Sequence, residues 1–249
     1  DAMTGAITIH AKALTKRFGA FTAVDAIDLD VHAGEIFGFL GANGAGKTTA
    51  MKMLIGLLMP TAGEARVAGY DVYTQSEAVK RSIGYKGQRF SLYNDLPLLE
   101  NIQFYGGVYG VPPAELKRRT DSLVHDLGLK EHVNTRLQSL PLGWKQKLAF
   151  SVAMIHEPKI IFLDEPTGGV GLITRRPFWG LIYAPAAKRV PGFLTPPYID
   201  EADYSHPPSV MVDGVMAACD TPAALKEQFK VKTMDEVFYQ LARSAQRAE

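Results

Sequence analysis

The sequence has little cysteine and no long apolar run. These two absences limit the classes of protein to which the chain can belong. Cys219 is the one cysteine among 249 residues, which excludes a disulfide framework and fits a reducing compartment. Its apolar neighbours predict a buried structural thiol. No apolar stretch approaches the roughly 18 residues of a membrane-spanning helix, and no signal peptide is evident. Any function at a membrane is therefore expected to depend on a partner protein.

An excess of charge of one sign is also lacking. The formal net charge is +1, so no overall field would attract nucleic acid or acidic lipid, and no nucleic-acid partner is expected. The densest basic run, Lys117-Arg118-Arg119, is typical of the solvated face of a helix. Neither an internal repeat nor a low-complexity linker is present. An apolar content of 47% suffices for one large α/β domain, or for a core with a smaller lobe.

The sequence does contain a phosphate-binding loop pattern. Residues 41–48 match G-x-x-x-x-G-K-[ST], between an apolar run at 35–40 and a helix-forming run at 49–55. In such a loop, glycines let backbone N–H groups point at phosphate, and the helix N-terminus favours an anion. Lys47 places a charge on the outer phosphates, and Thr48 offers a hydroxyl to Mg²⁺. A glycine turn without a ligand is the alternative, and the strand–loop–helix context disfavours it.

A second apolar run, residues 159–163, ends on two carboxylates, Asp164 and Glu165. We expect Asp164 to hold Mg²⁺ through water, and Glu165 to orient or deprotonate an attacking water. The alternative is a strand that becomes acidic because it has reached the surface. The phosphate loop in the same chain disfavours that alternative.

The remaining pattern predicts one α/β domain over residues 3–249, with a P-loop NTPase core built on a mixed or parallel sheet. Alternating polarity over 7–34 predicts an antiparallel β part. The core is expected to take up residues 35–90 and 157–249. A helical pattern over 92–155 predicts a lobe inserted into that core.

Several local features carry their own predictions. Asp213-Gly214 predicts a two-residue hairpin turn, Thr221 a helix cap, and residues 234–245 a last helix. His10 and His32 are expected to be solvated. A core role is expected for a set of residues at helical spacing: Asn101, Phe104, Tyr105 and Val108.

The order of these motifs resembles the ATP-binding subunit of an ABC transporter. Phe18, in the run 16–19, resembles the family's adenine-stacking aromatic residue, and Gln88 stands at its glutamine loop. Residues 140–148 resemble its signature segment. GTPases and kinases lack such a helix before the second strand, DNA-repair relatives have a longer insertion, and translation-factor relatives usually carry two cassettes. Two further runs look most like subunits serving ABC-2-type export permeases: 90–93 and 107–110.

The resemblance implies an ATPase that powers an export permease, peripheral on the inner face of the cell membrane, with ATP and Mg²⁺ as cofactors. It implies a dimer with a second cassette, identical or different, and docking of the helical lobe on the permease. Glu165 would be catalytic, and the metal would be served by Thr48, Gln88 and Asp164. The nucleotide would be bound by Phe18, Gly41, Ala42, Asn43, Gly44, Ala45, Gly46, Lys47, Thr48, Thr49, Gln88, Leu140 and Gly143.

Four residues depart from the family pattern. Pro141 and Leu142 replace the serine and first glycine of the signature, which removes a hydroxyl and puts a bulky side chain where backbone approaches phosphate. Gly171 stands at an interface aspartate and Pro197 at the switch histidine, and His206 comes too late to replace it. These changes favour an alternative, a cassette that binds ATP but hydrolyses it poorly within a heterodimer or tandem protein. A non-transport ABC ATPase of translation or DNA repair is a third reading.

Proline is abundant in one segment. Seven of the 15 prolines lie between 177 and 208, where the family has a helix and then a buried strand. We expect Pro185 to break that helix, and Pro191 with Gly192 to interrupt the strand. Either an irregular fold or residues that differ from the natural ones would account for this pattern.

Overall fold

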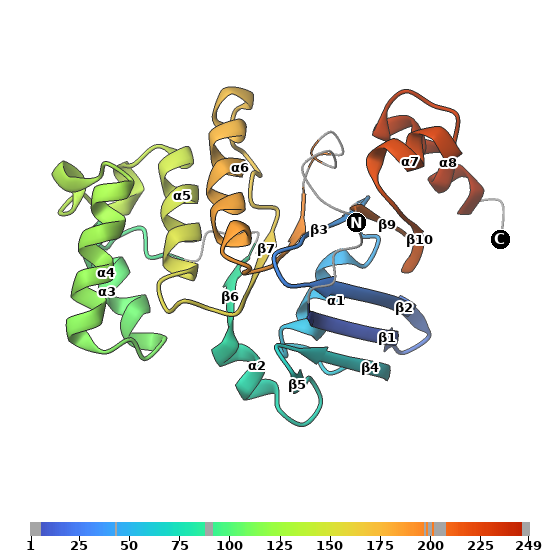
Figure 1. The fold of residues 1–249 in the computed structure, drawn as a ribbon, viewed down its shortest axis with the longest axis horizontal. Coiled ribbons are helices and arrows are strands. Elements are labelled where there is room, and N and C mark those ends of the chain that lie inside the picture. The colour runs from blue at the N-terminus through green and yellow to red at the C-terminus, as the bar shows by residue number, and fades with distance from the viewer. Residues whose placement is uncertain are drawn as a thin grey trace.

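The computed structural model describes residues 6–42, 44–87, 92–196, 198, 201 and 208–245. This part of the chain forms two β-sheets with helices packed around them (Figure 1). No helix within it is long and apolar enough to cross a membrane. Some residues singled out from the sequence lie outside the described residues: Asn43, Gln88, Phe90, Ser91, Pro197 and His206.

A six-stranded sheet with the order β10-β9-β3-β8-β7-β6 carries the two predicted apolar strands. Five strands are parallel and β10 pairs antiparallel at one edge: β3 (Ile36–Gly41), β6 (Ile83–Lys86), β7 (Ile160–Asp164), β8 (Gly192–Thr195), β9 (Pro208–Val212) and β10 (Val215–Cys219). All five residues of β7 are buried, because helices or strands cover both faces. Parallel strands end at the same edge of a sheet, so Gly41, Asp164 and Thr195 come together there.

A separate antiparallel sheet has the order β2-β1-β4-β5. Its strands are β1 (Ile7–Phe18), β2 (Phe21–His32), β4 (Ala62–Val67) and β5 (Tyr70–Asp71). The sequence predicted the first two strands, but the assignment of residues 62–71 to the parallel core is wrong. In β4, buried Ala65 and Val67 alternate with exposed Glu64 and Arg66, a pattern typical of a half-buried antiparallel strand.

Helix α1 (Lys47–Leu54) fills the space between the two sheets. Its buried Met51, Met53 and Leu54 join one apolar cluster with Phe39 and Phe162 of the six-stranded sheet and with residues of the antiparallel sheet. The short helix α2 (Ser76–Ser82) leads into β6. The phosphate loop is therefore anchored at both ends, in a buried strand before it and a buried helix after it.

The opposite face of the six-stranded sheet packs against α6 (Leu172–Ala187) and, near β9, against α7 (Pro222–Gln228) and α8 (Met234–Ala245). The predicted last helix is confirmed. The Asp213-Gly214 hairpin is confirmed too, since both residues have positive φ, 47° and 82°. Thr221 caps α7 as predicted, because its hydroxyl accepts a hydrogen bond from the Ala224 N–H at 3.2 Å.

Residues 92–155 are helical as predicted, with α3 (Leu98–Val108), α4 (Pro113–Asp126) and α5 (Leu142–Ala153) and two short 3₁₀ turns, 130–132 and 137–139. We call residues 92–155 the helical lobe. It has an apolar cluster of its own, and it lies at the far end of the molecule from α8 (Figure 1). Asn101 is buried and Tyr105 partly buried as expected, but Phe104 and Val108 are exposed, so their predicted core role is wrong.

Two further predictions about single residues have different outcomes. Cys219 is exposed, not buried, because the edge strand β10 turns it outward; the Ser209 hydroxyl donates to its sulfur at 3.0 Å. The basic run on α4 is mainly solvated as predicted, with Lys117 and Arg118 exposed. His10 is partly exposed and pairs with Asp30 at 2.6 Å.

The predicted disruption at the proline-rich segment is not found. Helix α6 runs through both Pro177 and Pro185. Pro177 lies on the exposed side, next to the buried Phe178 and Trp179, and Pro185 lies in the last turn, where its carbonyl accepts hydrogen bonds from Lys188 and Val190. Tertiary packing thus outweighs the unfavourable proline propensity. Pro191 precedes β8 and does not interrupt it, and its carbonyl accepts from the Ile161 N–H at 3.0 Å.

Replacing Pro177 by alanine is expected to stabilise the protein. The change adds the missing N–H within α6, and we expect the free energy of unfolding to rise by about 1–3 kcal/mol. Pro113→Ala is the matched control, because Pro113 occupies the first position of α4, where no N–H is needed. Chemical denaturation of both variants measures the effect. An unchanged midpoint for Pro177→Ala would show that proline costs this helix nothing.

Candidate functional site

The phosphate loop connects β3 to α1 and has the backbone that its glycines predict. Gly44 and Gly46 have φ of 83° and 99°, a region that favours glycine. A side chain at Gly46 would also collide with the carbonyl of Ala23 on β2. The hairpin turn braces the loop from outside, because the Gly214 N–H donates to the Ala45 carbonyl at 3.1 Å. Contacts with β2 and with the hairpin turn thus support the loop at Ala45 and Gly46.

A pocket of about 340 Å³ opens over this loop. The structure brings together in it seven of the predicted nucleotide-binding residues: Phe18, Ala42, Gly44, Gly46, Lys47, Thr48 and Thr49. Glu165, the predicted catalytic residue, lines it as well. The sequence analysis missed Phe21 and Ala23, which also line it. Phe18 and Phe21 pair across the β1–β2 turn, and their exposed fractions are 49% and 65%. An exposed aromatic residue on each side of a Gly-containing turn was the signal that could have identified Phe21.

Lys47 is buried at the floor of this pocket. Its ammonium group donates to the Gly41 carbonyl. Burial lowers the pKa of Lys47, whereas the negative charges of Glu165 and then Asp164 raise it. An anion placed over the loop would therefore meet a cation that is already partly desolvated and held in place.

Asp164 and Glu165 lie at the end of β7, as the sequence predicted, and Asp164 is buried. The two oxygens of the Asp164 carboxylate have different neighbours. Oδ1 accepts a hydrogen bond from the Thr195 hydroxyl at 2.6 Å, and Oδ2 lies 3.4 Å from the Thr48 hydroxyl. The phosphate loop and the second strand are thus joined directly through Thr48 and Asp164.

Glu165 has a left-handed backbone, with φ of 48°. This conformation is unfavourable for a residue with a Cβ, and such strain is concentrated at functional sites. Its N–H donates both to the carbonyl of Thr195 at 3.0 Å and to the hydroxyl of Thr195 at 3.1 Å. The Glu165 carbonyl accepts from the Gly168 N–H at 3.0 Å. Neither this conformation nor the contacts of Thr195 with Glu165 could be predicted from a sequence pattern.

The signature segment lies away from the pocket. Leu140 packs its side chain in the apolar cluster of the helical lobe, so a contact with a nucleotide would have to come from its backbone. Gly143 lies in the first turn of α5 and does not line the pocket. Pro141 caps α5, and its carbonyl accepts from the Trp144 and Lys145 N–H groups. Leu142 is exposed, at 46%, so the bulky side chain predicted to obstruct the segment does face outward.

The segment after Glu165, residues 166–171, is held in place by buried or partly buried polar contacts. The Thr167 hydroxyl donates to Glu201 Oε2 at 2.7 Å, and the indole N–H of Trp179 lies 3.3 Å from Glu201 Oε1. The amide of Gln146 on α5 donates to the Gly168 carbonyl at 3.3 Å. This segment leads to Gly171, the N-cap residue of α6.

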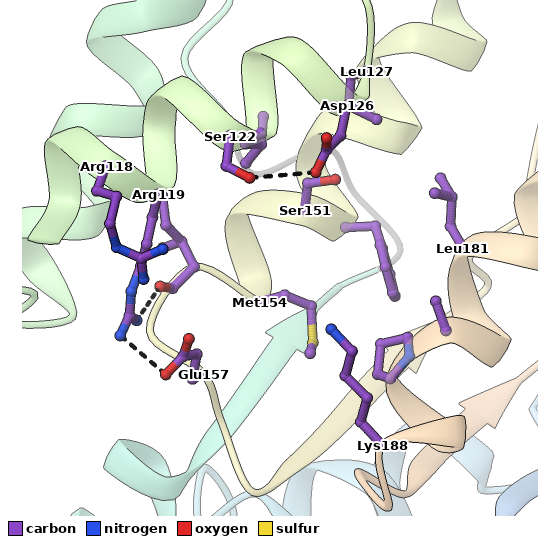
Figure 2. Close-up of a pocket in the computed structure, with 15 residues that line it drawn as sticks. Arg118, Arg119, Ser122, Asp126, Leu127, Ser151, Met154, Glu157, Leu181 and Lys188 are labelled. Atoms are coloured by element: carbon purple, nitrogen blue, oxygen red, sulfur yellow. Dashed lines mark hydrogen bonds and ion pairs between the residues drawn. The ribbon is translucent and has the colours of Figure 1, made fainter.

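A second groove, of about 470 Å³, lies between α4, α5 and α6 (Figure 2). None of the residues predicted to bind nucleotide or metal lines it. Arg119 lines one edge of it, donating to the Ile155 carbonyl at 2.6 Å and pairing with Glu157 at 3.0 Å (Figure 2). These contacts fasten α4 to the connection between α5 and β7. The contacts of Arg119 thus help to attach the helical lobe to the core. The groove is lined by none of the residues predicted to bind nucleotide or metal or to act in catalysis.

Lys86, at the end of β6, is a buried cation that the sequence analysis did not single out. It is 1% exposed, and its ammonium group has no hydrogen-bond partner among the described residues. Burial lowers its pKa to about 8, against the opposing effect of Asp164 and Glu165. It pairs in register with Leu163, next to those carboxylates. A buried and unpaired amino group is a cost to stability.

Replacing Lys86 by methionine is expected to stabilise the protein by roughly 2–3 kcal/mol at pH 7, because the variant no longer buries a charge. The unfolded chain keeps this proton up to about pH 10.5, so it binds more protons than the folded chain between pH 8 and 10.5. Wild-type stability should therefore rise with pH across this window relative to the variant.

Chemical denaturation at several pH values measures both effects. Lys117→Met is the matched control. Because Lys117 is 80% exposed, this variant should show neither the gain in stability at pH 7 nor the pH dependence. A Lys86→Met variant that is less stable than the wild type at pH 7 would show that the buried ammonium group is favourable.

Comparisons with known proteins agree with this geometry. A family model described as ABC transporter matches residues 24–168. The chain is 42% identical to the probable multidrug ABC transporter ATP-binding protein YbhF of Escherichia coli over 95% of its own length and 42% of that protein. It is 33% identical to human phospholipid-transporting ATPase ABCA3, over 83% of this chain and 12% of that protein. The chain thus spans less than half the length of these curated relatives.

The fold is similar to that of solved ABC transporter subunits. A solved structure of an ATP-binding subunit of an ABC transporter is 26% identical, with a TM-score of 0.83 over 94% of this chain and 99% of that one. The predicted P-loop α/β fold with an antiparallel sheet and helices is thereby confirmed. The matched region includes the phosphate loop, Asp164 and Glu165. With the family model covering more than half of the sequence, the chain belongs to the ABC transporter family.

Proposed function

We propose that this chain is the ATP-binding and ATP-hydrolysing subunit of a membrane exporter. The observation that carries the proposal is the pocket over the phosphate loop, in which Lys47 and Thr48 meet Glu165 from a distant part of the sequence. The names of the relatives, a multidrug transporter protein and a phospholipid-transporting ATPase, support an export role. The subunit would lie on the inner face of the cell membrane, attached through a permease.

ATP would be bound along the length of the pocket. Phe18 and Phe21 are exposed at one side and suit stacking on adenine, while the N-terminus of α1 and Lys47 suit the phosphates. Lys47 donates to a backbone carbonyl, and a phosphate would offer it a charged acceptor instead. Asn43 and Gln88 are proposed to contribute as the family pattern implies.

Magnesium fits the donors that the structure brings together. The Thr48 hydroxyl and Asp164 Oδ2 are hard oxygen ligands 3.4 Å apart, and Gln88 is proposed as a third donor. The described residues hold no group of three or more His, Cys, Asp and Glu side chains that could bind a metal alone. Such a site suits magnesium, which protein commonly binds through one or two side chains together with substrate phosphates. When bound, the ion would neutralise charge on those phosphates.

Glu165 is proposed as the general base. It lines the phosphate pocket directly after the buried strand β7, and its left-handed backbone fixes where its side chain begins. A carboxylate at this position can accept the proton of a water that attacks the terminal phosphate. Lys47 and the loop N–H groups would stabilise the charge that develops on the phosphate oxygens.

A second cassette is proposed to complete the site. The described part of this chain supplies the loop side of the pocket only, since the signature segment at 140–143 lies elsewhere. In a dimer the signature of one subunit would cover the phosphates of the other, contributing Gly143. Pro141 supplies no N–H and Leu142 projects from the start of α5, so each would weaken this cover.

The helical lobe is proposed to carry the permease contact. Tyr93, Phe104 and Tyr105 form a cluster of aromatic rings, with centroids 5.3–6.0 Å apart. Tyr93 and Phe104 are about half exposed, and Val108, one turn further along α3, is 65% exposed. Exposed apolar side chains gathered on one helix suit a protein partner. Tyr93 follows Gln88 by five residues in the sequence, so the proposed nucleotide contact and the proposed docking surface are close along the chain.

Replacing Glu165 by glutamine tests the proposed chemistry. We expect ATP turnover by the purified chain to fall by at least about a hundredfold, because the amide cannot accept the proton. ATP binding, measured by titration calorimetry, should persist. Glu131→Gln, a change at an exposed position on the helical lobe, serves as the control. Equal turnover in the wild type and Glu165→Gln would exclude Glu165 as the base.

Restoring the signature tests whether this segment limits the rate. A Pro141→Ser, Leu142→Gly double variant should raise turnover by roughly tenfold or more at concentrations that allow pairing, because it returns a hydroxyl and a close backbone approach. Affinity for ATP should stay the same, since neither residue lines the pocket. Pro112→Ser, the same cap change on α4, is the matched control. An unchanged rate would place the limitation outside the signature.

A further inference from the structure

Thr195 lies beside the two carboxylates and has no part in the function proposed so far. It ends β8, directly opposite Asp164 in the parallel register with β7. Its side chain is fully buried, at 0% exposed. Its hydroxyl donates to Asp164 Oδ1 at 2.6 Å and accepts from the Glu165 N–H at 3.1 Å. The Thr195 hydroxyl therefore contacts two consecutive residues of the site, Asp164 through its side chain and Glu165 through its backbone.

The contact with Asp164 fixes the rotation of its carboxylate. Because Oδ1 is engaged by Thr195, Oδ2 is the oxygen that faces the Thr48 hydroxyl, 3.4 Å away. Loss of the Thr195 hydroxyl would leave Oδ1 buried without this donor, and the carboxylate would be free to turn toward another partner. The orientation that leaves Oδ2 open toward the phosphate loop thus depends on a neighbouring strand.

The contact with Glu165 acts on the backbone. The left-handed conformation of Glu165, with φ of 48°, is unfavourable and needs compensating contacts. Its N–H is shared between the hydroxyl and the carbonyl of Thr195. The same residue that orients Asp164 therefore also stabilises the turn from which the Glu165 side chain starts.

We propose that Thr195 is a positioning residue of the nucleotide site, whose hydroxyl directs Asp164 Oδ2 toward the magnesium ion that accompanies ATP. The proposal rests on the metal role proposed for Asp164. It extends that role by assigning the orientation of the carboxylate to a residue that touches neither nucleotide nor metal. Outer partners of metal ligands typically change metal affinity by 10- to 100-fold when they are removed.

The experiment compares Thr195→Val, which removes the hydroxyl at similar size, with Thr195→Ser, which keeps it. ATP affinity of the full chain is measured by titration calorimetry with a chelator and over a series of Mg²⁺ concentrations. We expect Thr195→Val to bind ATP normally without metal, but to need about 10- to 100-fold more Mg²⁺ for the metal-dependent gain in affinity. Thr195→Ser should behave as the wild type.

Thr167→Val is the matched control. It also removes a buried hydroxyl that donates to a carboxylate, at 2.7 Å to Glu201, but leaves Asp164 untouched. It should lower the thermal midpoint and leave the Mg²⁺ dependence unchanged. If Thr195→Val does not fold, Thr195→Ala makes the same comparison with less crowding.

Asp164→Asn separates the two proposals. If it weakens the Mg²⁺ dependence while the Thr195 variants lacking the hydroxyl do not, Thr195 is not a positioning residue and the metal role of Asp164 stands. If Asp164→Asn also leaves the dependence unchanged, the metal role itself is wrong. A loss in Thr195→Val that serine does not restore would likewise overturn the role of the hydroxyl.

Discussion

The register between β7 and β8 is the constraint on which the site depends. β7 is buried along its whole length, so its carboxylates reach the pocket only where the strand ends. Pairing then sets Asp164 opposite Thr195, while β3 on the other side of β8 delivers Gly41 to the same edge. A slip of one residue would turn the Thr195 hydroxyl to the other face and leave Asp164 without it. The apolar packing of the sheet thus fixes the polar geometry of the site.

That packing also determines the electrostatics. Lys47, Lys86 and Asp164 are all buried, in surroundings where charges interact more strongly than in water. Burial lowers the pKa of Lys47 and of Lys86, and the carboxylates oppose this in both cases. Only Lys47 has a hydrogen-bond acceptor, the Gly41 carbonyl, among the described residues. The two lysines therefore differ in role, one lining the phosphate pocket and the other enclosed behind it.

The sequence was informative where one local rule decides the outcome. The phosphate loop, the strand ending in Asp164 and the Asp213-Gly214 turn each follow from a short pattern with a single physical meaning. Prediction from the sequence failed where tertiary packing outweighs helix propensity. Helix α6 contains Pro177 and Pro185 and is nevertheless formed, because one side of it is buried. Prediction also missed contacts between strands distant in sequence, above all Thr195, because register cannot be read from either strand alone. Cys219 was misplaced for a related reason: the face of an edge strand depends on its partner.

The signature segment and the pocket over the phosphate loop belong to different parts of the fold, so ATP binding and ATP hydrolysis can depend on different residues. Every described residue that lines the pocket comes from the β1–β2 turn, the phosphate loop with α1, or the end of β7. These parts belong to two sheets whose buried faces meet in one apolar cluster around α1, which holds the two sides of the pocket together. Leu142 and Gly143 instead start α5, whose apolar side is built into the helical lobe. In the proposed pair of cassettes, they would approach the phosphates bound by the partner cassette. The changes at Pro141 and Leu142 would then act on closure of that pair, since neither residue lines the pocket over the phosphate loop of its own chain.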